Sequence, residues 1–313
     1  MLRYMLKRTL QTIPVMAIVA FLVFALLYIT PGDPAAVIAG DQASAEDVAR
    51  IRVALGLDRP FFIRFGEWSW TVLHGDLGTS IFTSLPVGKL MLQRVEPTLS
   101  LMAITLVFSI SLAVPLGVVA AWRAGSWIDS AVMGFAVLGF SVPVFVVGYL
   151  LTYVFALQLD WLPVQGYTSI SAGLWPWFKS LILPSVSLAL VYVALIARIT
   201  RATMLEVLGQ DYVKTARAKG LGEHAVLFVH ALKNAAVPIV TVIGLGIALL
   251  IGGAVVTESV FAIPGLGRLT IDAILRRDYP VIQGIVLVFS FSYVIVNLCV
   301  DLVYTLVDPR IRY

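Results

Sequence analysis

Six long apolar windows of the sequence contain no Asp, Glu, Lys or Arg, and they constrain the fold more than any other feature. They are residues 9–32, 97–122, 130–159, 180–197, 234–257 and 279–300. A helix needs about 20 apolar residues to cross the hydrocarbon core of a bilayer. The mean hydropathy is +0.96 and only 13% of the residues are charged, whereas soluble folds carry about a quarter charged residues. The sequence therefore predicts an all-α membrane protein with six transmembrane helices.

Two other interpretations of these windows are disfavoured. Barrel strands are segments of about 10 residues that alternate apolar with polar side chains, and the windows do not alternate. A secretory signal would have an apolar core of about 7–15 residues and a small-residue cleavage site. The first apolar run instead continues from Ile13 to Ile29 and ends near Pro31, so we expect this helix to be retained. The single cysteine, Cys299, lies in the last window, where we expect it to pack without reacting.

Basic residues in the short loops predict the orientation in the membrane. One set of loops and termini carries most of them: Arg3, Lys7, Arg8, Arg123, Arg198, Arg201, Lys214, Arg217, Lys219, Lys233, Arg310 and Arg312. The opposite short loops carry only Lys179, Arg268, Arg276 and Arg277. Because short cytoplasmic loops are rich in Lys and Arg, we expect a multi-pass membrane protein with both termini in the cytoplasm. The basic pI then reflects topology, and no nucleic-acid partner is expected.

Residues 33–96 form the one sizeable segment expected outside the membrane on the far side. Ser44 and Asp47 have the spacing of a capping box, and Gly56 can end the helix that they start. The aromatic residues Phe61, Phe62, Phe65, Trp68 and Trp70 follow and favour a helix at the lipid headgroups. A lid that packs on the helix ends and a binding pocket both remain open, and the lid is the simpler interpretation.

Several windows contain residues that disturb helices or permit close packing. Ser141 and Pro143 lie in the third window and are candidates for the lining of a transport pathway, although simple helix packing is the better explanation for either residue alone. In the fifth window Gly244, Ala248 and Gly252 lie on one helix face. Small residues at this spacing predict close contact with another helix, either in this chain or in another subunit.

The chemistry that the sequence lacks is also informative. It has no G-x-x-x-x-G-K-[ST] loop, no zinc-binding histidine pair and no G-x-S-x-G motif, so we expect no catalytic residues, no metal and no bound cofactor. Carriers coupled to ions place ionisable residues near the middle of the membrane, but here the nearest candidates, Glu258 and Asp301, lie at window ends. Glu258 is a candidate for an outer gate. The energy source is therefore expected in a partner.

The stretch DYVKTARAKGL, residues 211–221, is a short basic segment between the fourth and fifth windows. Asp211 can cap a helix, Tyr212, Val213 and Ala216 share one face, and Gly220 can end the helix with Leu221 folding back. An isolated helix this short is only marginally stable in water. It therefore needs a surface, either anionic lipid or a groove in a protein.

This stretch resembles the cytoplasmic coupling segment of the inner-membrane permeases of binding-protein-dependent ABC importers, most closely the dipeptide, oligopeptide and nickel branch. Further similar strings run in order along nearly the whole chain: TPGDPA (30–35), GDLGTS (75–80), LPVQGY (162–167), ESVFAIPGLGRL (258–269), RDYPVIQG (277–284) and DPRIRY (308–313). The wider family has Glu-Ala-Ala and a glycine six residues after the Glu. Here Lys214 stands in place of the Glu, followed by Thr215 and Ala216, with Gly220 at the glycine.

The resemblance implies a type I importer permease fold and a set of partners. Residues 1–95 would hold the first helix and the extracytoplasmic segment, 96–307 the transport domain, and 308–313 a cytoplasmic tail. The implied partners are a similar second permease, two ATP-binding subunits that carry ATP and Mg, an extracytoplasmic solute-binding protein, and membrane lipid. The implied cargo is dipeptides or oligopeptides, with nickel and glutathione left open.

The implied coupling segment is a helix that sits in a cleft of the ATPase. Its residues are Tyr212, Val213, Lys214, Thr215, Ala216, Arg217, Ala218, Lys219, Gly220 and Leu221. Small Ala216 and Gly220 would allow close approach, and the basic residues would meet acidic groups of the partner. An ion-coupled secondary transporter and a non-transporting membrane scaffold are the alternatives.

Overall fold

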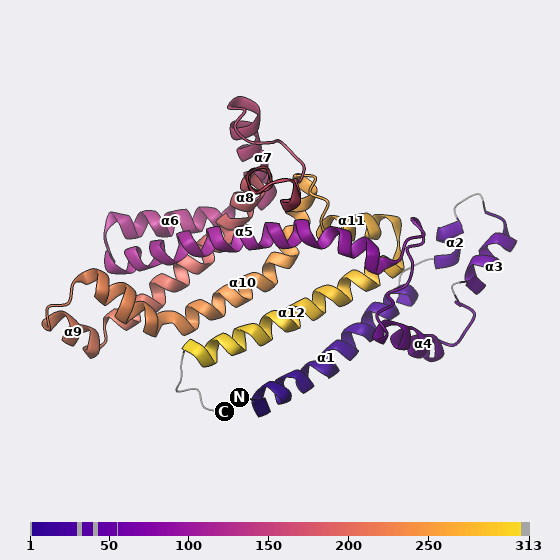
Figure 1. Cartoon of the computed structure of the whole chain (residues 1–313), viewed down its shortest axis with the longest axis horizontal. Helices are drawn as coiled ribbons and strands as arrows, with labels where there is room; N and C mark the ends of the chain where they lie inside the picture. Colours follow the sequence, from indigo (N-terminus) through magenta and orange to yellow (C-terminus); the bar gives the residue numbers. More distant parts are fainter. Residues whose placement is uncertain (1, 30–32, 40–42, 55, 308–313) are drawn as a thin grey trace. The chain divides into compact units, whose positions relative to one another are not determined.

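The structure is a computed structural model that describes residues 2–29, 33–39, 43–54 and 56–307. The predicted tail 308–313 lies outside the described residues. Helices dominate the chain (Figure 1), which confirms the all-α prediction. In chain order the elements are α1 (Leu2–Ile29), α2 (Pro34–Ala39), α3 (Ala45–Ala54), α4 (Phe61–Leu73), α5 (Val87–Trp122), α6 (Trp127–Ser141), α7 (Val144–Leu151), the π-helical η1 (Thr152–Gln158), the 3-10 turn η2 (Ile170–Ala172), α8 (Leu174–Leu208), α9 (Asp211–Ala218), the π-helical η3 (Ala225–Ala231), α10 (Leu232–Val260), α11 (Leu266–Arg276) and α12 (Tyr279–Val307).

The predicted spans appear as five continuous helices and one bent pair. The continuous spans are Arg8–Ile29, Val87–Trp122, Leu174–Leu208, Ala225–Val260 and Tyr279–Val303. The third window is not one straight helix, because α6 and the α7–η1 segment meet at an angle of 102°. The helices also extend beyond the apolar windows. Pro184 and Pro238 lie inside α8 and α10.

The chain divides into two compact units, of which the first contains Met1–Arg94 and Leu269–Val294. In this unit the aromatic side of α4 packs on α1, where Phe24 lies 5.4 Å from Phe61 and 5.3 Å from Trp68 between ring centroids. These contacts hold α4 against the end of the first span. The packing agrees with the expected lid on the helix ends. Because the same unit also contains a cavity, the alternative of a binding pocket stays open.

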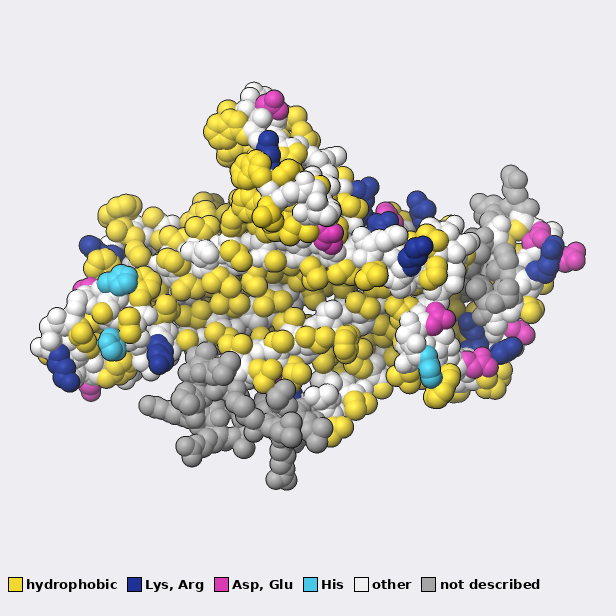
Figure 2. All heavy atoms as spheres, in the orientation of Figure 1, with side chains coloured by type: hydrophobic (Ala, Val, Ile, Leu, Met, Phe, Trp, Pro, Cys, Tyr) yellow, Lys and Arg dark blue, Asp and Glu magenta, His cyan; other side chains and the backbone are white. Residues whose placement is uncertain are grey.

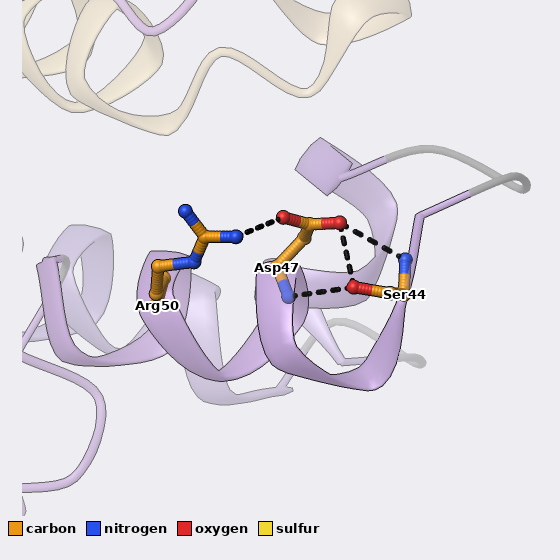
Figure 3. Close-up of polar contacts among 3 residues, drawn as sticks. All are labelled: Ser44, Asp47 and Arg50. Atoms are coloured by element: carbon orange, nitrogen blue, oxygen red, sulfur yellow. Dashed lines mark hydrogen bonds and ion pairs between the residues drawn. The ribbon is translucent and has the colours of Figure 1, made fainter.

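The predicted capping box at the start of α3 is confirmed (Figure 3). The Ser44 amide and hydroxyl donate to Asp47 Oδ2 at 3.2 and 2.7 Å, and the Asp47 amide donates to Ser44 Oγ at 3.2 Å. Arg50 adds an ion pair to the same carboxylate at 2.7 Å. The hydrogen bonds from Ser44, more than the charge of Arg50, hold the pKa of Asp47 below its usual range. Gly56, at φ +65°, follows the helix as expected.

The second unit, Val95–Arg268 and Ile295–Tyr313, is built around α8. In the most apolar part of α8, 72% of the residues are buried. The corresponding buried share in the other continuous spans is 11–33%. Glycines on the neighbouring helices let them approach α8 closely. A Cβ added at Gly117 of α5 would lie 2.6 Å from the Thr200 Cβ, and one at Gly139 of α6 would lie 3.0 Å from the Leu190 carbonyl oxygen. The core of this unit therefore depends on backbone contact at those glycines.

α10 makes close contacts within this chain, but not along the predicted stripe of small residues. Gly244 faces α12, where an added Cβ would lie 2.3 Å from Val300. Gly246 and Gly253 instead face Tyr192 and Leu188 of α8. No heavy atom of the described residues lies within 4 Å of a Cβ added at Gly252. Within this chain the close contacts of α10 are thus shared between two faces and two neighbouring helices, and packing of the 244, 248 and 252 stripe against another subunit stays a prediction.

Candidate functional site

α9 is the helix predicted in the basic stretch, and its end forms as expected. Gly220, at φ +80°, ends the helix after Ala218. Its N–H donates to the Arg217 carbonyl at 2.9 Å, and the Leu221 N–H donates to the Ala216 carbonyl at 3.3 Å. This pair of bonds is a Schellman motif, in which a glycine adopts the left-handed conformation without strain.

The start of α9 differs from the prediction that Asp211 caps it. Gln210 precedes the helix, and its side chain makes no capping hydrogen bond. Asp211 is the first helical residue, and its carboxylate accepts a hydrogen bond from Lys214 at 2.8 Å. A carboxylate in the first turn still stabilises the helix through its dipole. Asp211 therefore stabilises α9 as a residue of its first turn and not as its N-cap.

The inner face of α9 packs against its own chain. Val213 is fully buried and Ala216 is 9% exposed, and both contact Val226 of η3 and the last turn of α8. Tyr212, expected on the same face, is 42% exposed. Ala216 is therefore already covered, and the expected close approach of a partner at Ala216 is not available.

The outer face of α9 is formed by Asp211, Lys214, Thr215 and Ala218, which are all exposed. Their spacing of i, i+3, i+4 and i+7 places them on one side of the helix. In Figure 2 basic and histidine side chains gather around α9, whereas apolar side chains cover the spans. Ala218 is the one small residue on this outer face.

Two of the three basic residues of α9 and its end have partners within the chain. Lys214 pairs with Asp211, and Arg217 donates two hydrogen bonds to Glu223 at 2.8 and 3.2 Å. Both pairs are well exposed, and such pairs contribute only about 0–1 kcal/mol. Lys214 and Arg217 can therefore form ion pairs with other acidic groups at a low cost in free energy.

A π-helical turn and one side-chain contact connect α9 to α10. The hydroxyl of Tyr212 bonds to the side chain of Asn234, in the first turn of α10. Partial burial raises the pKa of Tyr212 above its ordinary value, and this hydrogen bond opposes the shift. In η3, Leu227 and Ala231 pack on Met204 of α8. No periodicity in the sequence indicated this π-helical joint.

Glu258 lies at the end of α10 and is fully buried. The Thr98 hydroxyl donates to its carboxylate at 2.6 Å, and the Arg268 N–H donates to it at 2.9 Å. The Leu266 N–H in turn donates to the Thr98 hydroxyl at 2.8 Å. Glu258 and Thr98 thus cap the start of α11 from two other helices. We call this group, with Gly265 and Gly267, the Glu258 clasp.

The two glycines of the clasp make room for the carboxylate and for the α10 backbone. A Cβ at Gly265 would lie 2.2 Å from the Glu258 carboxyl group, and one at Gly267 would lie 2.6 Å from the Val255 Cα. A backbone atom cannot move aside as the end of a side chain can. The clasp therefore requires glycine at 267.

Gly267→Ala is expected to lower the free energy of unfolding by about 2 kcal/mol, since overpacking typically costs 1–3 kcal/mol. Gly134→Ala in α6 is the matched control, because no neighbouring atom of the described residues lies within 4 Å of the added Cβ. Thermal melting of the purified chain measures both. A Gly267→Ala protein as stable as the Gly134→Ala control would contradict the close contact.

The bend between α6 and α7 contains both residues proposed for the pathway lining. Val142 is extended (φ −93°, ψ 124°), and Pro143 precedes the first residue of α7. Proline lacks an N–H and disfavours a helical residue before it, which explains the break. Ser141 and Pro143 are exposed, and the Ser141 hydroxyl donates to the Val137 carbonyl at 2.8 Å. The bend thus presents both side chains away from the chain.

An ion pair between α6 and α8 was missed by sequence reasoning. Arg201 donates two hydrogen bonds to Asp129, one of them at 2.7 Å, and Asp129 is nearly buried. The Gly125 N–H also donates to Asp129, at 3.0 Å. The partners are 72 residues apart, so no local pattern could join them. In the sequence analysis Arg201 served only as one of the basic residues that predict the orientation in the membrane.

Comparison with known proteins assigns the whole chain. Residues 1–113 match the N-terminal domain of binding-protein-dependent transport system membrane components, and residues 113–313 match the inner membrane component itself. The "Probable peptide ABC transporter permease protein" of Sinorhizobium fredii is 56% identical over 310 residues, 99% of each chain. The glutathione transport system permease protein of Salmonella choleraesuis is 43% identical over 314 residues, all of both chains.

A solved structure supports the fold. A chain of the inward-facing MetNI methionine ABC transporter superposes with a TM-score of 0.57, covering 70% of this chain and 96% of that one. The two chains share 18% sequence identity, so the likeness concerns the arrangement of helices alone.

Proposed function

Because the chain belongs to the family of binding-protein-dependent transport system inner membrane components, we propose that it forms half of the pathway through which an ATP-driven importer takes up peptides. It is a multi-pass inner membrane protein and a permease subunit of an ABC importer, and ATP hydrolysis takes place on separate subunits. The observation that carries the proposal is α9, a short helix with a buried inner face and an exposed outer face.

In this proposal the outer face of α9 sits in a cleft of the ATPase. Ala218 allows the close approach first expected at Ala216, together with Gly220 and Leu221 at the helix end. Acidic groups of the ATPase replace Asp211 and Glu223 as partners of the basic residues, because the exposed pairs are weak. Val213 and Ala216 contribute from the inner face by transmitting movement of α9 to α8 and η3.

Peptides are the proposed cargo because the relative with 56% identity is named for peptide transport, and glutathione remains a candidate through the 43% relative. Nickel is less well supported. Among the described residues, no group of three or more His, Cys, Asp or Glu could hold a metal ion.

The proposed assembly contains a homologous second permease, two ATP-binding subunits that bind ATP and Mg, and an extracytoplasmic solute-binding protein. Both termini and α9 lie in the cytoplasm, with 1–95 as the first helix and extracytoplasmic segment, 96–307 as the transport domain and 308–313 as the tail. A cysteine introduced at Ala218 in a Cys299→Ser chain would test the orientation. Labelling of intact cells by a membrane-impermeant maleimide at that position would contradict it.

The outer gate and the pathway lining are further parts of the proposal. Ser141 and Pro143 face the pathway from the bend. Glu258 is buried, so it acts at the outer gate as a positioning residue, fixing α10, α11 and Thr98 to one another through hydrogen bonds.

Uptake by the reconstituted complex tests the function. Proteoliposomes that contain both permeases and the ATPases, supplied with the binding protein, are expected to accumulate labelled short peptides only with ATP on the ATPase side. Omitting this chain should remove uptake. Uptake by the chain alone, driven by a proton gradient, would instead identify a secondary transporter, and ATP-driven uptake that persists without the chain would identify a scaffold.

A further inference from the structure

A cavity of about 390 Å³ lies in the first unit, between α1, α4 and the start of α12. This volume is in the range of pockets that hold small molecules, about 300–1,000 Å³. Its walls include Phe24 near the end of one span and Tyr279 and Gln283 in the first turn of another. Because one span ends and the other begins beside the cavity, it lies at the level of the lipid headgroups.

The charged groups of the cavity come from α4 and the residues before it. Arg64 is half-buried, and its guanidinium lies 5.5 Å from the Phe24 ring and 5.4 Å from the Tyr28 ring, with a hydrogen bond to the Tyr28 hydroxyl. Arg59 pairs with Glu67 at 3.1 Å. Among the described residues that line the cavity, two positive charges thus face one negative charge, and this balance favours an anion.

The three groups differ in how firmly they are held. The Arg59–Glu67 pair is more than half exposed on both sides, so opening it costs at most about 1 kcal/mol. Arg64 is fixed between aromatic rings, an arrangement that orients a guanidinium and lowers its exposure to water. The cavity therefore has one fixed cation and one cation that can change partner.

The surface of α4 indicates what surrounds the cavity. Phe62, Trp70 and Leu73 are 77%, 67% and 79% exposed, while the opposite side of the helix packs on α1. Large exposed aromatic and aliphatic side chains at the end of a span are typical of a helix that lies in the headgroup layer. An anion that reaches the cavity from that layer carries acyl chains.

We propose that this cavity binds the phosphate group of a membrane phospholipid, with Arg64 as the fixed anchor and Arg59 as a second donor. Guanidinium groups bind phosphate oxygens through short, charge-assisted hydrogen bonds. Glu67, released from Arg59, accepts the ammonium group where the lipid is a phosphatidylethanolamine. Phe24 and Trp68 contact the glycerol and the first acyl carbons. A phospholipid bound at this site anchors α4 to the bilayer.

Photocrosslinking tests this inference with the full chain in vesicles that contain a phosphatidylethanolamine with a diazirine close to its headgroup. Crosslinks are expected on residues 59–81 and near Phe24. Arg64→Leu should reduce them about tenfold, since a hydrogen bond to a charged group contributes about 1.5–3 kcal/mol, and Arg64→Lys should restore part of the signal.

Controls separate the lipid site from general effects. Arg123→Leu removes another arginine that lies over an aromatic ring, Trp122 at 4.3 Å, and should leave these crosslinks unchanged. Thr71→Trp fills the cavity with Arg64 intact and should reduce them as Arg64→Leu does; thermal melting confirms that each variant folds. Unchanged crosslinking in folded Arg64→Leu would overturn the inference.

Discussion

Ala218→Trp is expected to reduce ATP-driven peptide uptake at least about tenfold while the chain still reaches the membrane. Ala218 lies on the outer face of α9, away from the buried Val213 and Ala216. A tryptophan there does not disturb the packing of α9 on α8, but it prevents close contact with the ATPase, and overpacking typically costs about 1–3 kcal/mol. Uptake, ATP hydrolysis and co-purification of the ATPase measure the effect.

Two control variants make this prediction specific. Ala218→Ser keeps a small side chain and should transport normally. Ala124→Trp places the same bulky residue in the exposed connection between α5 and α6, and it should also transport normally. Normal uptake by Ala218→Trp would show that the outer face of α9 does not enter a cleft.

Arg201→Leu is expected to lower the free energy of unfolding by about 3 kcal/mol. Removing one partner of a buried pair leaves the other charge uncompensated, which costs about 3–5 kcal/mol; the lower end applies because the Arg201 side chain is 27% exposed. The reason is Asp129, which is only 7% exposed and would lose the guanidinium that compensates its carboxylate. Thermal or denaturant unfolding of the purified chain measures the loss.

A double-mutant cycle tests the cause of that loss. Asp129→Asn removes the charge but keeps an oxygen for the Gly125 N–H. The double variant Asp129→Asn/Arg201→Leu should therefore recover most of the stability lost in Arg201→Leu. Additive losses would show that the two side chains are not energetically coupled.

Local features of this chain could be predicted from sequence because they depend on residues a few positions apart. Ser44 and Asp47 form the capping box from a spacing of three, and Gly220 ends α9 because it follows the last helical turn. The long charge-free windows likewise indicated the spans, since the thickness of the bilayer sets their length.

Features that depend on distant parts of the chain could not be predicted. Glu258 meets Thr98 across 160 residues, and Asp129 meets Arg201 across 72. Pro143 indicated a disturbed helix, but the 102° angle depends on how α6 and α7 pack on α8. Helical spacing alone predicted that Tyr212 lies on the inner face of α9. Which residues are buried depends on the contact with Val226, which lies outside α9, so the spacing within α9 could not show it.

α10 joins the two features on which the proposed transport cycle depends. Its 29 residues form one helix, about 43 Å long at 1.5 Å per residue. One end continues from η3, which packs beside α9, and the other ends in the buried Glu258. In the proposed function, one continuous helix therefore connects the coupling segment to the Glu258 clasp. In the same proposal, movement that Val213 and Ala216 pass from α9 to η3 would reach the far surface as a displacement of the whole α10 helix.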